Sequence, residues 1–161
     1  MNKKKIILIG ILLISIAIFA QKSKLKIQND SLELPINYKI KISAKIKDEK
    51  LYDFKLLKKQ KVKRPTDMIK ILDNEINKKI ISKEIEFKFC YADFMGSRLV
   101  VLTTVHHLKN PIIYKAKIKI KGKKNYIETS IVTKYPNVFS VEQWQNEIES
   151  IILYDFKTIK E

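Results

Sequence analysis

The stretch Ile36–Lys47 alternates apolar and polar residues at every position. A β-strand points successive side chains to opposite faces, so this pattern predicts one long strand with a buried face and a hydrated face. The buried face would carry Ile36, Tyr38, Ile40, Ile42, Ala44 and Ile46. The first constraint on the fold is therefore a sheet with a core against this side of the strand.

Ile112–Lys121 repeats the pattern, and lysine dominates the hydrated side of both stretches. We call these sides the two lysine faces: Lys39, Lys41, Lys45 and Lys47 in the first, and Lys115, Lys117, Lys119 and Lys121 in the second. Like charges directly opposed in a sheet are destabilising, so either the two strands are separated or their lysines meet an anionic partner. These lysines are the candidate binding residues, and two ordinary solvated faces are the alternative.

Four further segments have strand character. Leu51–Lys58 would form a hairpin with the opening strand, and Glu84–Asp93 would form another with Arg98–Leu108. Within the part Arg98–Val105, both alternating sets that follow Arg98 are apolar or threonine, which predicts a central strand covered on both faces. Tyr126–Thr133 is the fourth β-rich run.

Two segments show helical spacing. Residues 65–80 begin with Pro65-Thr66-Asp67 and continue with apolar residues at helical intervals, Ile69, Leu72, Ile76 and Ile80. At Ser140–Lys160, Ser140 and Gln143 have the spacing of a capping box. The apolar stripe of this second helix would be Trp144, Ile148, Ile151 and Ile152.

The order of these elements, ββαββββα, predicts an α+β domain with a mainly antiparallel sheet of about six strands and two amphipathic helices. Helices on both sides of the sheet would bury the lysine faces. We therefore expect both helices on the apolar side only.

Three features together resemble exported PsbP-like domains: Asp30–Pro35, which runs into a proline, the central strands, and a closing Trp144 helix that ends with Ile151–Lys157. The resemblance implies a helix–sheet–helix sandwich and a binding or accessory role without an active site.

The N-terminus has the pattern of a secretory signal peptide, with three lysines in Met1–Lys5 before the uncharged run Ile6–Ala20. Cleavage after Ala20 is the first interpretation, and an uncleaved membrane anchor is the alternative. Residues 21–161 have the length of one domain. We therefore predict a single extracytoplasmic domain, periplasmic or secreted.

The net charge of +16 favours anionic partners, namely an anionic polymer, a membrane surface or an acidic protein. Arg64 and Arg98 are the only arginines in the sequence. Arginine is the residue favoured for reading phosphates and bases, so specific nucleic-acid binding is not expected. The composition does not predict the oligomeric state.

Residues with catalytic potential are few. His106 and His107 are adjacent in a predicted strand, so they point to opposite faces and cannot bind one metal ion together. Cys90 is the only cysteine, so it has no disulfide partner within the chain, and no local motif marks it as a nucleophile. Glu84 and Glu86 could form a pair of catalytic carboxylates, but a solvated, charged strand face is the simpler interpretation. We expect no metal, no cofactor and no enzymatic activity.

The leading hypothesis is thus a small exported binding or accessory domain that contacts an anionic envelope component or an acidic partner through a lysine face. One alternative is an interaction subunit with an aromatic cleft beside the C-terminal helix, lined by Tyr126, Tyr135 and Trp144. A hydrolase without a recognisable motif is a third, minor hypothesis.

Overall fold

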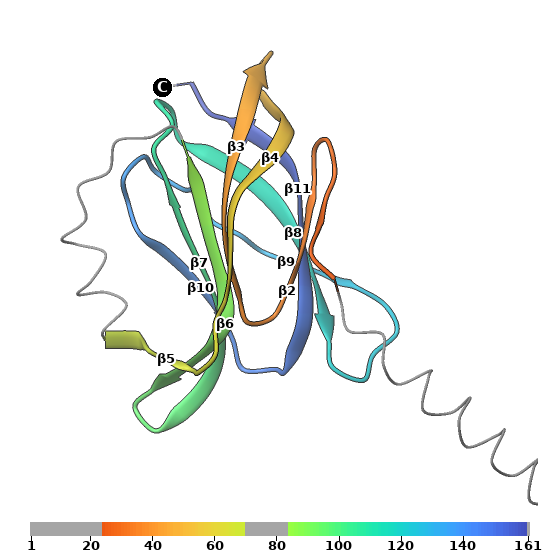
Figure 1. Cartoon of the computed structure of the whole chain (residues 1–161), viewed down its shortest axis with the longest axis vertical. Coiled ribbons are helices and arrows are strands. Elements are labelled where there is room, and N and C mark those ends of the chain that lie inside the picture. Colours follow the sequence, from red (N-terminus) through yellow and green to blue (C-terminus); the bar gives the residue numbers. More distant parts are fainter. Residues whose placement is uncertain (1–23, 70–83, 161) are drawn as a thin grey trace, which may run out of the picture.

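The computed structural model describes residues 24–69 and 84–160, and this part of the chain is an all-β domain (Figure 1). Its strands are β1 (Lys26–Ile27), β2 (Leu32–Pro35), β3 (Tyr38–Lys47), β4 (Lys50–Lys61), β5 (Thr66–Asp67), β6 (Ile85–Phe94), β7 (Ser97–His106), β8 (Ile112–Ile120), β9 (Ile127–Thr129), β10 (Ser140–Trp144) and β11 (Ile148–Thr158). The predicted α+β class is therefore wrong. Most of the helix predicted over residues 65–80 falls on residues 70–83, which lie outside the described residues.

The predicted C-terminal helix is in fact the strands β10 and β11. The pairing of β11 with β8 shifts register between Ile148 and Ser150 and again between Tyr154 and Lys157. Each shift adds a residue to one strand, as in a β-bulge. The inward apolar residues of β11 consequently fall at irregular intervals that resemble helical spacing: Ile148, Ile151, Leu153 and Phe156.

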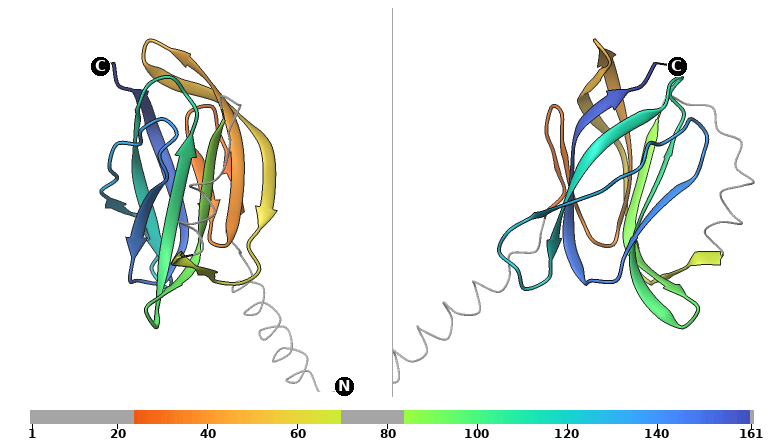
Figure 2. Two further views of the ribbon diagram at one scale, coloured as in Figure 1. Left: turned by 90° about the vertical axis from the view of Figure 1, so that its left-hand side faces the viewer. Right: turned by 180° about the vertical axis from the view of Figure 1, so that it is seen from behind.

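Strand β11 pairs with other strands along both of its edges. One edge pairs with β8 over most of its length. The other edge pairs with β2 from Ser150 to Leu153, and beyond Asp155 it meets β4 through Lys157 and Lys50. The order β4-β3-β6-β7-β10 then continues the sheet as a second layer that folds over the first (Figure 2).

The two layers enclose one hydrophobic core. The ring of Phe87 on β6 lies 5.8 Å from that of Tyr114 on β8 and 6.2 Å from that of Phe156 on β11. Strand β6 pairs with neither β8 nor β11, so these aromatic contacts join the two layers across the core. Trp144 on β10 packs edge-on against Phe89 at the side of this core, with the ring centroids 6.4 Å apart.

The prediction that the segment Arg98–Val105 is covered on both faces is confirmed by β7. Leu102 faces the main core, and Val101 on the opposite face is equally buried. Val101 belongs to a second, smaller apolar cluster with Met68, Cys90 and Ala92. The segment that follows β4 therefore covers the outer face of β6 and β7.

Among the described residues, no helix is both long enough and apolar enough to cross a membrane. The signal peptide or anchor predicted at residues 1–20 lies outside the described residues.

Replacing Glu49 with glycine should stabilise the domain. Asp48 and Glu49 form the two-residue turn between β3 and β4 with φ values of 49° and 65°. This left-handed backbone costs a residue with a side chain about 1 kcal/mol. We expect Glu49→Gly to raise the free energy of unfolding by about 1 kcal/mol in urea denaturation. Glu49→Ala is the control, because it removes the same exposed ion pair with Lys160 but keeps Cβ. Equal effects of the two variants would contradict the turn geometry.

Candidate functional site

The lysines of the first face, on β3, are mostly paired with carboxylates of neighbouring strands. Lys39 lies 2.6 Å from Glu86, and Lys41 lies 3.1 Å from Glu84. Lys45 lies 2.8 Å from Asp53 on β4, and hydrogen bonding between them lowers the pKa of Asp53 below its ordinary value. Within the described part of the chain, Lys47 has no carboxylate partner.

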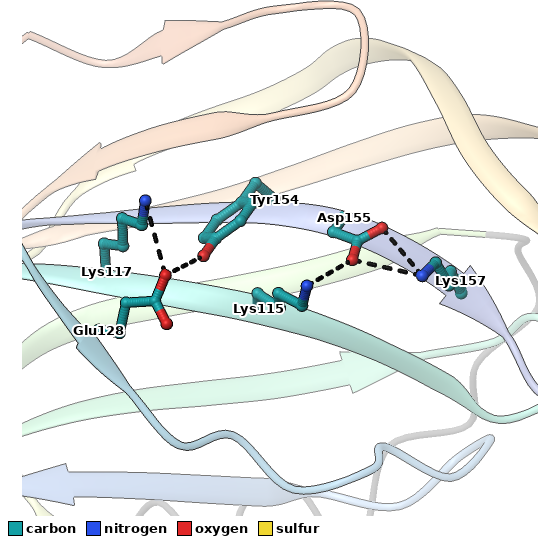
Figure 3. A network of polar contacts seen from close by, with 6 residues as sticks. All are labelled: Lys115, Lys117, Glu128, Tyr154, Asp155 and Lys157. Atoms are coloured by element: carbon teal, nitrogen blue, oxygen red, sulfur yellow. Dashed lines mark hydrogen bonds and ion pairs between the residues drawn. The ribbon is translucent and has the colours of Figure 1, made fainter.

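The lysines of the second face, on β8 and directly after it, are all paired. Lys115 contacts Asp155, and Lys117 contacts Glu128, which also accepts a hydrogen bond from Tyr154 (Figure 3). Two further pairs continue along the strand, Lys119–Glu149 and Lys121–Glu147. The hydrogen bonds from Lys115 and Lys157 lower the pKa of Asp155.

The two lysine faces do not merge. Strands β3 and β8 lie in different layers, and the inner faces of these layers meet at the aromatic core. Their outward lysines therefore occupy opposite sides of the domain. Each face is a ladder of cross-strand ion pairs, and this arrangement explains how a lysine-rich strand fits into the sheet.

A hollow of about 510 Å³ lies where β4 ends, and it is lined mostly by basic side chains. We call it the basic hollow, and its lining is Lys39, Gln60, Lys61, Val62, Lys63, Arg64 and Lys88. Lys39 sits directly opposite Gln60 on one side and Lys88 on the other. Lys39 is thus the one candidate lysine of the sequence analysis that lines the hollow.

The loop that carries Lys63 and Arg64 is held at both ends. The Val62 amide donates a hydrogen bond of 2.8 Å to the Asn37 carbonyl, and the Val62 side chain packs on the smaller apolar cluster. Two residues after Arg64, β5 pairs in parallel with β6. The backbone at the rim of the hollow is therefore anchored to the sheet.

Lys61, Lys63 and Arg64 are exposed and have no carboxylate partner in the described part of the chain. Close, uncompensated cations attract anions more strongly than lysines already paired with acids. These three residues are not among the binding residues predicted from the sequence. The signal was nevertheless present, since residues 54–66 contain basic residues and no acidic one.

A second group of polar side chains is buried between β7, β8 and β10. Lys134 is 0% exposed, and its ammonium group contacts the Glu142 carboxylate. Thr104 and Tyr114 share a hydrogen bond of 2.8 Å, and burial raises the pKa of Tyr114. These contacts tie β10 and the preceding segment to the core, so their role is structural.

His106 belongs to this buried group. Its Nε2 lies 2.9 Å from the Lys134 carbonyl, so Nε2 carries the hydrogen that is donated. Nδ1 has no hydrogen-bond partner among the described residues. Burial lowers the pKa of His106, because an imidazolium here would have a second N–H without an acceptor.

The residues considered for catalysis do not come together. Cys90 lies in the smaller apolar cluster, on the opposite side of the sheet from the buried His106. Burial also raises the pKa of the Cys90 thiol, which disfavours the nucleophilic thiolate. Glu84 and Glu86 are engaged by lysines. Among the described residues, no group of three or more His, Cys, Asp or Glu side chains could hold a metal ion.

The three aromatic residues proposed as a cleft lining have separate surroundings. Tyr126 shares a hydrogen bond with Ser150 and donates one to Glu33, and the Trp144 indole donates to Thr129. Tyr135 is 53% exposed. Because the C-terminal helix is absent, the cleft beside it is not formed as predicted.

Comparisons with family models, with curated proteins and with solved structures find no match to this chain. The resemblance to PsbP-like domains therefore stays a prediction.

Replacing Glu142 with glutamine should strongly destabilise the domain. Removing the charge leaves the Lys134 ammonium group uncompensated in the core, and breaking a buried ion pair in this way costs about 3 kcal/mol or more. Urea denaturation measures this loss. Glu147→Gln is the matched control, because Glu147 forms an exposed pair with Lys121 and its loss costs about 1 kcal/mol or less. Similar losses in the two variants would show that the Lys134 site is hydrated.

Acidification should destabilise the domain through His106. Since its pKa is lowered in the folded state, the unfolded chain takes up the proton first, near a pH of about 6.5. The free energy of unfolding is therefore greatest above that pH and falls below it. We expect His106→Gln to flatten this dependence between pH values of about 8 and 5. The half-buried His107 provides the control. His107→Gln should keep the pH dependence of stability, and loss of that dependence in His107→Gln but not in His106→Gln would exclude His106 as the cause.

Proposed function

We propose that this chain is a small extracytoplasmic, non-catalytic binding domain that holds an anionic group in the basic hollow. The observation that carries the proposal is the close placement of Lys61, Lys63 and Arg64, all without acidic partners in the described chain, around a hollow of about 510 Å³. That volume lies within the range of small-ligand sites. The partner would be an anionic envelope component or an acidic protein.

The chemistry of the lining fits an oxyanion such as phosphate. An arginine side chain offers planar, paired N–H donors, and lysine ammonium groups add mobile point charges. Gln60 contributes an amide whose N–H₂ group can donate to a further oxygen. The anchored backbone at Val62 reduces the ordering that Lys63 and Arg64 would need on binding.

The two lysine faces are less suited to this role. Seven of their eight lysines are paired with carboxylates of the domain. An incoming anion would therefore have to displace a carboxylate from the lysine that it binds. Exchange of one anion for another yields little net free energy. The hollow replaces the lysine faces as the binding surface in this proposal, with Lys39 common to both.

The absence of catalysis is part of the proposal. It is supported by the inaccessible Cys90 thiol, the structural engagement of His106 and the paired state of Glu84 and Glu86. Export is supported by the basic and apolar pattern of residues 1–20.

Neutralising the loop cations should weaken binding of a small polyanion. We would titrate the full-length protein with inorganic tripolyphosphate by calorimetry and compare it with the double variant Lys63→Gln/Arg64→Gln. Each charge-assisted hydrogen bond contributes about 1.5 kcal/mol or more, so affinity should fall at least tenfold. Binding by the unmodified protein should also weaken as salt concentration rises.

The control is the double variant Lys55→Gln/Lys58→Gln, which removes the same charge from exposed positions of β4 outside the hollow. It should lose no more than about threefold, through long-range attraction alone. Equal losses in the two double variants would show that net charge, not the hollow, binds the anion. Absence of any binding by the unmodified protein would refute the proposal.

A further inference from the structure

The turn between β6 and β7 presents apolar side chains to solvent. Met95 is 86% exposed and Phe94 is 37% exposed. Large apolar residues at such exposure contribute little to the core. Both residues stand at the tip of the hairpin formed by β6 and β7. The ribbon of this hairpin extends to one end of the domain (Figure 1).

The backbone conformation of this turn is unfavourable for methionine. Met95 has φ of 48° and Gly96 has φ of 79°, the values of a two-residue hairpin turn in which Asn-Gly is the favoured pair. A methionine is strained in this left-handed region, whereas asparagine tolerates it. Within the described residues, neither turn geometry nor core packing explains a methionine here, and its exposed side chain is available for an interaction outside the domain.

The apolar turn and the basic hollow lie at the same end of the domain. The connection from β4 to β5, which carries Lys63 and Arg64, reaches this end beside the β6–β7 turn in both views (Figures 1 and 2). The turn between β8 and β9, with Lys123 and Lys124, lies at this end too. The turn between β3 and β4 and residue Lys160 lie at the other end.

Apolar side chains that project beside unpaired cations match the surface of an anionic bilayer. The apolar side chains would enter the boundary between headgroups and acyl chains, and the cations would contact lipid phosphates. An acidic surface alone would satisfy the cations but would offer no apolar environment to Met95. We propose that this end of the domain docks on an anionic membrane, with Phe94 and Met95 inserted and a lipid phosphate in the basic hollow. This inference rests on the proposed function, because it assigns the anion of the hollow to a lipid headgroup.

A local probe of insertion tests the inference in the full-length protein, where residues 6–20 can also bind membranes. Met95→Cys would be labelled with an environment-sensitive fluorophore, and Asp48→Cys at the opposite end is the matched control. Cys90 is 0% exposed, so the native thiol is protected from the label. We expect a blue shift at position 95 on phosphatidylglycerol vesicles. Phosphatidylcholine vesicles should give no such shift, and position 48 should stay in water on both.

The double variant Lys63→Gln/Arg64→Gln would carry the same label at position 95. It should need roughly 25-fold more anionic lipid for the same shift, since each basic residue near such a surface strengthens binding about fivefold. The unlabelled variant Met95→Asn should weaken anionic-vesicle binding about tenfold without lowering Tm. Equal shifts at positions 95 and 48, or on both lipids, would overturn the inference.

The outcomes separate the two proposals. Tripolyphosphate binding in the hollow without a shift at position 95 would refute membrane insertion and leave the anion-binding function standing. The opposite result would be no tripolyphosphate binding, with a fluorescence shift at position 95 that is the same in the variant Lys63→Gln/Arg64→Gln. That result would refute the anion-binding function.

Discussion

The architecture depends on backbone hydrogen bonding along both edges of β11. A strand in the middle of a sheet satisfies its amide and carbonyl groups on two sides, and β11 achieves this with three partners, β2, β4 and β8. One edge of β11 pairs first with β2 and then with β4, so β11 must change direction between the two. The change coincides with Asp155, whose backbone is left-handed. That change lets one strand belong to both layers, and the aromatic contacts of Phe156 then fill the space between them.

Electrostatics on the outside of the sheet follow from the same registers. Because strands from distant parts of the sequence lie side by side, lysines on β3 and β8 face carboxylates on β4, β6, β9 and β11. Individual exposed pairs contribute little stability, but they remove the repulsion that a row of lysines would create. Positive charge without a carboxylate partner in the described chain remains on β4 and in the loop that follows it, and the basic hollow lies there.

The sequence was informative where hydrophobic alternation was regular. The strands predicted around Ile36–Lys47, Glu84–Asp93 and Ile112–Lys121 are present as β3, β6 and β8. The sequence pattern gave a wrong prediction in β11, where bulges disturb the alternation of apolar and polar residues. Ile148, Ile151 and Phe156 there have the spacing of a helix, although they lie in a strand. The capping signature at Ser140 was outweighed by strand pairing with Thr104. Local propensity could not show this, because pairing is a long-range interaction.

The candidate site was predictable only in part. The lysine faces follow from alternation, but their neutralisation depends on which carboxylates the sheet brings opposite them, and a single strand carries no such information. The basic hollow depends on the end of β4, the anchored Val62 and the row formed by Lys39 and Lys88. The sequence shows the positive charge of this region. Only the fold shows that the charges surround a common space.

The position of β11 in the chain also bears on how the domain forms. It is the last strand of the described chain, and its partner β2 lies near the other end. Until residues 148–158 arrive, β2 and β8 lack their shared neighbour, so the first layer cannot be completed from local contacts. Folding that waits for such a distant pairing is slow and highly cooperative. Partly formed chains would therefore expose β8 and β2 to other molecules, and the lysines along β8 would keep those exposed edges apart by mutual repulsion.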